Sequence, residues 1–229
     1  MNFQTTASVS RAPPMQPDAG AACCTRSAVR RALDRRLKMH ERTQKDPLAW
    51  EKLSTEHIIN DQWIDFRKSA FRYPDGRVFE PFYAYTKRDY AVIAATDTSG
   101  RYICVRQFRQ GIEKVTTEFP AGGIEKNELE LCSDPEEAAL KAAKRELLEE
   151  SGYESDDWEH LLTIPANPTI CDNYVHLFRA GKCRKVAEQK LDETEYLNVI
   201  LLEPQQLEKM IHEGAFEQSD HIVAWYMSR

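Results

Sequence analysis

The chain has 229 residues, of which 41% are hydrophobic and 30% charged, as in a globular domain with an appendage. No apolar run approaches the ~20 residues that a membrane helix needs, so we expect no membrane span. The formal net charge of −6 argues against a nucleic-acid-binding protein, because such proteins carry an excess of Lys and Arg to neutralise phosphates.

The beginning of the chain differs from the rest in charge. Residues 1–45 hold nine Lys/Arg and three Asp/Glu, which leaves 22 and 34 for the other 184 residues. Large apolar residues are also few there, so residues 1–47 are predicted to form a disordered basic leader before a domain of residues 48–229. We expect a cytoplasmic protein. The alternative is mitochondrial targeting by this Arg- and Ser-rich leader.

The six cysteines lack the paired spacing of a zinc site or a redox motif. They are interpreted as free thiols in a reducing compartment.

The domain begins with a predicted β-hairpin, residues 62–85, in which apolar and polar residues alternate around the turn signal Pro74-Asp75-Gly76. Two strands joined by a turn are expected next, followed by a short strand that Pro120, Gly122 and Gly123 interrupt. The further strands and helices that the pattern predicts cover residues 90–96, 101–109, 116–125, 134–151, 158–165, 173–183, 195–203, 204–214 and 219–229.

The one long helical pattern is residues 134–151, and Gly152 is placed to end it. Strands on both sides of this helix predict an α/β or α+β fold with a mixed sheet between helices.

This helix carries three glutamates within one turn, Glu146, Glu149 and Glu150. Like charges at this spacing repel mildly, and a solvated helix face is the common explanation. The alternative is a Mg²⁺ site, because Mg²⁺ binds carboxylate oxygens and keeps several waters. Arg145 lies four residues before Glu149 and can pair with it.

The stretch Arg-Glu-Leu-Leu-Glu-Glu-Ser-Gly-Tyr, residues 145–153, resembles the second half of the Nudix box, and the upstream EFPAGGIE resembles the strand and glycine turn before it. With VRQFRQG and LDETEYLNV, the chain is most similar to the ADP-ribose pyrophosphatase branch of the Nudix hydrolases. The resemblance implies an α/β/α sandwich with a mixed β-sheet, plus an N-terminal β-hairpin sheet. It also implies hydrolysis of a diphosphate linked to another moiety.

The resemblance implies a role for several residues of the metal site. Glu146 and Glu150 match the principal metal ligands, Glu149 belongs to the same cluster, and Ala121 matches a residue whose backbone carbonyl binds metal. The expected cofactor is Mg²⁺, with Mn²⁺ as a substitute.

The first half of the box does not fit the same register. The box requires a glycine, five residues, a glutamate and seven further residues before the arginine. Glu137 has the spacing to Arg145, but position 131 is Leu. We therefore expect an insertion of about one helical turn, a longer loop over residues 125–133, and Glu137 on the far side of the helix from Glu146. Glu125, Glu128 and Glu130 are the alternative outer metal ligands.

A water-activating glutamate is expected before the strand of residues 195–203. Glu195 is favoured and Glu193 is the runner-up, while a surface charge is the alternative for either.

Substrate contacts are expected from strand-end polar groups and from the N-terminal hairpin. Arg109, and after it Arg106, suit phosphate oxygens, and Glu118 suits a ribose or the orientation of a phosphate group. By resemblance, Trp63 and Tyr83 are candidates for stacking on a base, in a homodimer. His176 and His221 are predicted to be packed or surface histidines, because no partner lies at ligand spacing.

The sequence thus predicts hydrolysis of ADP-ribose or a related nucleoside diphosphate sugar, giving AMP and a sugar phosphate. Two alternatives stay open: hydrolysis of another nucleoside diphosphate derivative, and a Nudix-fold nucleotide-binding module with weak or no turnover.

Overall fold

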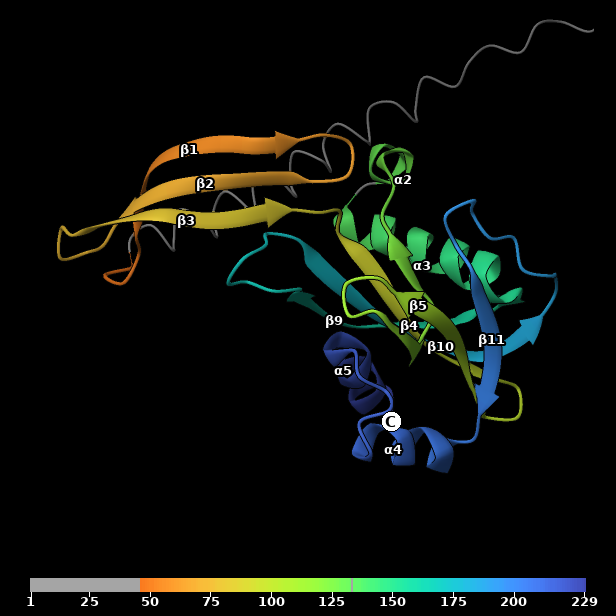
Figure 1. Cartoon of the computed structure of the whole chain (residues 1–229). Coiled ribbons are helices and arrows are strands. Elements are labelled where there is room, and N and C mark those ends of the chain that lie inside the picture. Colours follow the sequence, from red (N-terminus) through yellow and green to blue (C-terminus); the bar gives the residue numbers. More distant parts are fainter. Residues whose placement is uncertain (1–45, 133) are drawn as a thin grey trace, which may run out of the picture.

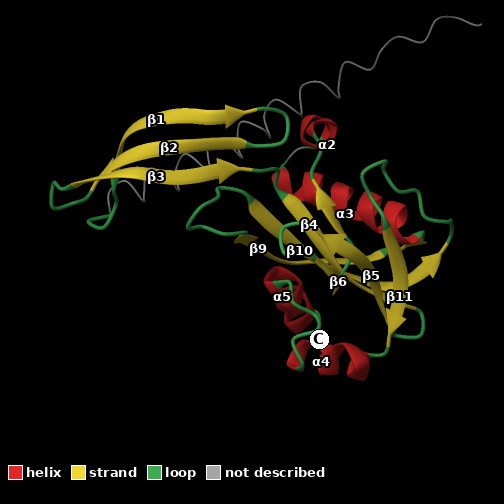
Figure 2. Cartoon of the chain, in the orientation of Figure 1, coloured by secondary structure: helices red, strands yellow, loops and turns green. Residues whose placement is uncertain are grey.

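The computed structural model describes residues 46–132 and 134–229, which form two β-sheets and flanking helices (Figures 1 and 2). The predicted leader lies outside the described residues, except for residues 46 and 47. No helix within the described ranges is long and apolar enough to cross a membrane. Cys104, Cys132, Cys171 and Cys183 are buried free thiols, as predicted.

The smaller sheet is an antiparallel arrangement of β1 (Glu51–Asn60), β2 (Asp65–Arg72) and β3 (Val78–Thr86), and it extends away from the main body (Figure 1). The predicted hairpin is β2 and β3, whose turn is closed by Tyr73 N–H donating to the Arg77 carbonyl at 2.8 Å. Strand β1 was not predicted. Every residue of β1 is exposed, so its sequence carries no alternation that burial would impose.

The larger sheet has eight strands, with the main order β11-β5-β4-β10-β8. Among the described strands of this sheet, only β10 and β4 pair in parallel, so the sheet is mixed, as predicted. Its strands are β4 (Tyr90–Asp97), β5 (Tyr102–Arg109), β6 (Lys114–Glu118), β7 (Ala121–Gly123), β8 (Tyr153–Glu154), β9 (Asp157–Pro165), β10 (Tyr174–Lys185) and β11 (Leu197–Leu202).

Strands β4 and β5 diverge after a single paired position, Thr96 with Tyr102. Strand β6 pairs with β5, and β7 pairs with β4, so residues 114–123 fill the space between them. The Pro120 carbonyl accepts a hydrogen bond from Ile93 N–H at 3.0 Å. This arrangement places the glycine turn at the middle of the sheet, beside the long helix.

Helices cover both faces of the larger sheet (Figure 2). In β4, Ala91, Ile93 and Ala95 pack in the cluster that contains α3 (Pro135–Ser151), whereas Val92 and Ala94 pack toward α4 (Pro204–His212) and α5 (Ser219–Met227). This alternation arises because successive strand residues point to opposite faces. The α/β/α sandwich is confirmed.

Helix α3 begins and ends where its sequence predicts. The Asp134 carboxylate accepts from Glu137 N–H at 2.9 Å, and Pro135 takes the first helical position. Gly152 ends the helix with a φ of 73°, where a side chain would be strained. One prediction for the preceding segment was wrong: residues 125–133 include the short helix α2 (Lys126–Leu131) rather than a loop.

Candidate active site

Three carboxylates converge beside the glycine turn. Glu146 and Glu150 lie one turn apart on α3, and Glu195 comes from the segment before β11. One oxygen of each lies within 4.8 Å of the others, and Glu146 and Glu150 are buried. Glu195 was the favoured late glutamate, and the structure brings it to the other two.

Burial makes this cluster electrostatically unfavourable without a counter-charge. It raises the pKa of Glu146 to about 7, against the opposing effect of Arg145. Burial also raises the pKa of Glu150 well above its usual range, and the neighbouring charge of Glu146 adds to the effect. Three oxygen ligands with too little positive charge nearby fit a hard divalent cation.

Arg145 fixes this end of α3 through four hydrogen bonds. It donates to Glu128 at 2.9 Å, to Glu146 at 2.8 Å, to Glu149 at 3.0 Å and to the Gly123 carbonyl at 3.0 Å. The predicted pair of Arg145 and Glu149 is therefore present. Glu149 is not a member of the three-carboxylate cluster.

The contact with Glu128 explains the irregular first half of the box. Glu128 is 3% exposed and lies six residues after Gly122, which is the glycine–five residues–glutamate spacing. Sixteen residues, 129–144, then separate it from Arg145, so the added residues follow this glutamate. Glu137 is exposed in the first turn of α3, outside the cluster, as expected for a coincidental match. Glu125 caps α2 and Glu130 is exposed, so neither belongs to the cluster.

The glycine turn packs directly against the carboxylates. Ala121 N–H donates to Glu150 Oε2 at 3.0 Å. A Cβ atom at position 122 would lie 2.0 Å from Glu146 Cδ and Oε1. Position 122 therefore requires glycine because the buried carboxylate occupies the place of a side chain.

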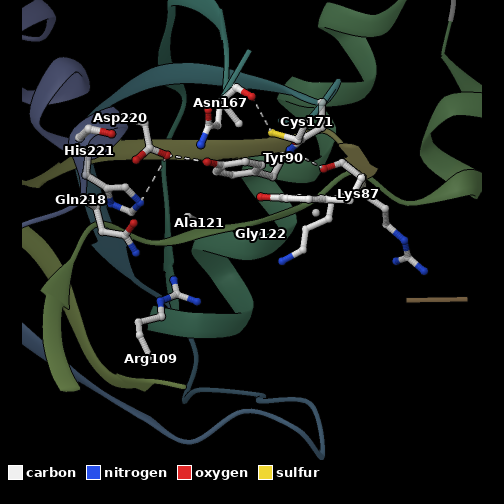
Figure 3. Close-up of a pocket in the computed structure, with 16 residues that line it drawn as sticks. Lys87, Tyr90, Arg109, Ala121, Gly122, Asn167, Cys171, Gln218, Asp220 and His221 are labelled. Atoms are coloured by element: carbon white, nitrogen blue, oxygen red, sulfur yellow. Dashed lines mark hydrogen bonds and ion pairs between the residues drawn. The ribbon is translucent and has the colours of Figure 1, made fainter. Parts of the chain in front are cut away.

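A cavity of about 500 Å³ adjoins this turn (Figure 3). Its lining comes from the start of β4, the turn, the loop after β9 and the first turn of α5. The lining residues are Tyr85, Lys87, Arg88, Tyr90, Arg109, Ala121, Gly122, Gly123, Ala166, Asn167, Cys171, Asn173, Gln218, Ser219, Asp220 and His221.

Arg109 enters this cavity from β5 and is held by Glu118. Their closest atoms, Arg109 Nη2 and Glu118 Oε2, are 2.5 Å apart, and Glu118 is fully buried. Burial alone would raise the pKa of Glu118, but hydrogen bonds from Arg109 and Thr116 hold that pKa below its usual range. Glu118 therefore holds the guanidinium of Arg109 in place.

Other predicted substrate residues lie outside this cavity. Arg106 is exposed and lines a second cavity with Lys114, Thr117, Ile200 and Met210. Its prediction as a phosphate contact is not supported, because successive residues of β5 point in different directions.

The remaining predicted residues are exposed. Trp63 is 71% exposed in the turn between β1 and β2, and Tyr83 is 46% exposed on β3. Glu193 is exposed and outside the carboxylate cluster.

The sequence did not single out Tyr90 and Asp220, which are 130 residues apart in the chain and joined by a hydrogen bond. His221 and His176 are both buried, in agreement with the packed alternative. His221 Nδ1 accepts from Phe119 N–H at 3.0 Å, and burial lowers the pKa of His221.

Comparisons with known proteins agree with this geometry. The family profile described as "NUDIX domain" matches residues 86–226. A methanol dehydrogenase activator of Bacillus methanolicus is 31% identical over 173 residues, which cover 75% of this chain and 88% of that protein. An ADP-ribose pyrophosphatase of Bacillus subtilis (strain 168) is 32% identical over 149 residues, covering 65% and 75%.

A mouse (Mus musculus) ADP-sugar pyrophosphatase is 29% identical over 151 residues, covering 62% of this chain and 65% of that protein. The crystal structure of an ADP compounds hydrolase superposes with a TM-score of 0.64 at 19% identity, covering 80% of this chain and 94% of the other. The matched region contains the carboxylate helix and the glycine turn. The chain therefore belongs to the Nudix family.

Proposed function

We propose that this Nudix protein hydrolyses the diphosphate of ADP-ribose or a related nucleoside diphosphate sugar, giving AMP and a sugar phosphate. The observation that carries the proposal is the buried cluster of Glu146, Glu150 and Glu195 beside a polar cavity large enough for one half of such a substrate. Two of the similar proteins are named as pyrophosphatases of ADP-ribose or ADP-sugars.

Glu146 and Glu150 would hold Mg²⁺, or Mn²⁺ in its place, with the Ala121 carbonyl as a further ligand, and Glu149 and Glu195 lie beside them. The bound metal would neutralise the diphosphate and polarise the attacked phosphorus. Arg145 keeps Glu146 in place through its 2.8 Å hydrogen bond, so the carboxylate is oriented before metal or substrate arrives.

Two groups outside α3 complete the proposed reaction. Arg109, with its guanidinium held by Glu118, would bind a phosphate oxygen. Glu195 is half-buried and comes from a loop, and we assign to it the acceptance of the proton from the attacking water. Glu193 is the weaker candidate, since it is exposed and lies outside the cluster.

The test is an AMP-release assay with ADP-ribose, ADP-glucose, GDP-mannose and diadenosine compounds in Mg²⁺ (GMP being scored for GDP-mannose). The matched variants are Glu150→Gln, in the cluster, and Glu130→Gln, which changes an exposed glutamate on α2. We expect turnover of at least one substrate, a loss of roughly 100-fold or more in Glu150→Gln, and no change in Glu130→Gln. Equal turnover in all three proteins would refute the assignment of the metal site.

We also propose a homodimer that is joined through the smaller sheet. The smaller sheet leaves several large apolar side chains exposed: Trp63, Ile58, Ile59 and Val78 are 71%, 46%, 48% and 53% exposed. A second copy would cover it and bring Trp63 and Tyr83 to a substrate base. Light scattering at micromolar concentration should return twice the 26.4 kDa chain mass. A monomer mass there would contradict the proposal.

The similarity to the methanol dehydrogenase activator favours a second candidate function, activation of a dehydrogenase, with or without turnover of a free nucleotide. This candidate gains support if no substrate in the assay is hydrolysed, ADP-ribose binds to wild-type and Glu150→Gln proteins alike, and the protein raises the rate of a methanol dehydrogenase. Cytoplasmic location remains a prediction of the sequence.

A further inference from the structure

Asp220 is a buried carboxylate that the proposed hydrolysis does not use. It lies in the first turn of α5, is 9% exposed and lines the cavity beside the glycine turn. Figure 3 shows its carboxylate next to the Tyr90 hydroxyl, on the side of the cavity where Asn167 lies.

Among the described residues, a hydrogen-bond donor reaches only one of its two oxygens. Tyr90 Oη donates to Asp220 Oδ2 at 2.8 Å, and His221 Nε2 is 4.0 Å from the same oxygen. Burial, followed by the charge of Asp220, raises the pKa of Tyr90 above its usual range, so Tyr90 remains a hydroxyl donor. Within residues 46–132 and 134–229, no group donates a hydrogen bond to Asp220 Oδ1.

A purely structural role accounts for part of this arrangement. A negative charge in the first turn of a helix is favourable, and the hydrogen bond from Tyr90 ties α5 to β4. Such a role does not require an acceptor oxygen that faces a cavity. The Asp220 side chain is 11% exposed, and among the described residues its Oδ1 is not one of the buried atoms that lack a partner, so this oxygen is accessible from the cavity and can accept a hydrogen bond from a further donor. A ligand in the cavity would supply that donor.

The cavity adjoins the carboxylate cluster through Ala121 and Gly122. A diphosphate bound at the cluster would therefore place one of its two attached groups in the cavity. Lys87, Arg88 and Arg109 line the same cavity and suit phosphate oxygens, whereas the negative charge of Asp220 disfavours a phosphate in direct contact with it. The free oxygen of Asp220 requires an O–H or N–H donor.

The lining favours a sugar over a nucleobase. Asn167, Gln218 and Ser219 provide amide and hydroxyl groups around Asp220. The Tyr85 ring, which a base would need as a flat platform, has the Lys87 ammonium 5.9 Å from its centroid. Polar groups at several angles match the hydroxyls of a sugar better than the face of a base.

We propose that Asp220 is a specificity-determining residue that accepts a hydrogen bond from a hydroxyl of the sugar attached to the second phosphate. The inference rests on the proposed hydrolysis and extends it. The preferred substrates carry an unphosphorylated sugar with a free hydroxyl at this place, and Tyr90 is the positioning residue that holds the carboxylate.

The test compares three substrates whose hydrolysis releases a nucleoside monophosphate. ADP-ribose has both the base and the sugar, inosine diphosphate ribose lacks the amino group of adenine, and ADP methyl ester has a methyl group in place of the sugar. Each is assayed with wild-type, Asp220→Ala, Asp220→Asn and Tyr90→Phe proteins, and titration calorimetry of ADP-ribose and ADP methyl ester gives a readout that needs no turnover.

For Asp220→Ala we expect kcat/KM to fall roughly 10- to 100-fold with both ribose substrates, as for loss of a hydrogen bond to a charged group, and to stay unchanged with ADP methyl ester. Asp220→Asn should lose less, since it keeps an acceptor oxygen without the charge. Tyr90→Phe should mainly raise KM for the ribose substrates, because the carboxylate loses its fixed orientation. If Asp220→Ala unfolds at a clearly lower temperature than the wild type, the comparison is made with Asp220→Asn instead.

An equal loss with all three substrates would overturn the inference and leave a structural role. A loss with ADP-ribose and ADP methyl ester, but not with inosine diphosphate ribose, would overturn it in favour of base recognition. If the wild-type protein hydrolyses nothing, the proposed function fails, and calorimetry still decides the inference. Asp220→Ala must then bind ADP-ribose more weakly and ADP methyl ester equally, and equal binding of ADP-ribose would refute the role of Asp220.

Discussion

The stability of the metal-free protein should fall as the pH rises from 5 to 8, and Glu146 should account for much of the loss. Burial raises the pKa of Glu146 from 4.5 to about 7. A raised carboxyl pKa means that the folded state binds more protons than the unfolded state between these two values. Stability is therefore lost as the pH rises through this window.

The magnitude follows from the size of the shift. Each unit of pKa difference corresponds to about 1.4 kcal/mol, so the full shift is worth about 3 kcal/mol, of which about 2.5 kcal/mol is lost between pH 5 and pH 8. Glu150 acts in the same direction, since its pKa is also raised. A divalent cation binds the ionised carboxylates and should restore stability at pH 8.

The assay is urea unfolding in EDTA at pH 5 and pH 8, for wild-type, Glu146→Gln and Glu130→Gln proteins. The glutamine at 146 cannot ionise, so this variant should lose about 2.5 kcal/mol less than wild type between the two pH values. The Glu130 variant changes an exposed carboxylate and should follow wild type. An identical pH dependence in all three proteins would refute the reasoning, as would an absence of any Mg²⁺ effect at pH 8 in the wild type.

Three further substitutions test the packing around the site. Gly122→Ala should weaken Mn²⁺ binding at least 10-fold in titration calorimetry, because its Cβ would lie 2.0 Å from Glu146 Cδ. Gly123→Ala should bind Mn²⁺ normally, because its Cβ would approach the Arg88 side chain no closer than 3.7 Å. Similar affinities for both variants would contradict this. Glu128→Gln should lower the free energy of unfolding by about 1–3 kcal/mol in urea, since Arg145 loses one of its three carboxylate partners. A change no larger than that of Glu130→Gln would be evidence against this contact. Phe216→Ala should lower the free energy of unfolding by about 3–5 kcal/mol, because Phe216 is 1% exposed and packs against Phe119 with ring centroids 5.2 Å apart. A loss below about 1 kcal/mol would mean that the surrounding core relaxes to fill the space.

The sequence determined the features that depend on neighbours along the chain. Helix α3 could be predicted because its cap at Asp134, its glutamate spacing and its end at Gly152 are all local signals. The central strands of the larger sheet were predicted from short apolar runs beside turn signals, a pattern that fits strands buried on both faces. The resemblance of residues 145–153 to the Nudix box identified Glu146 and Glu150 from their spacing alone.

Short or fully exposed elements were harder to predict. Helix α2 has six residues and depends on the reciprocal contact of Glu125 with Glu128, and Glu128 is in turn buried against Arg145. Strand β1 buries nothing within one chain, so no apolar periodicity marks it. In both cases the stabilising contacts come from outside the element.

Only the tertiary structure decided which distant side chains share the site. It brought Glu195 to the carboxylates of α3, separated Arg106 from Arg109, and placed Asp220 against Tyr90. These contacts depend on how β6 and β7 fill the space between β4 and β5, and on how α5 crosses the opposite face. Local propensity does not encode such long-range packing, because its free energy is gained only when the whole sheet has formed.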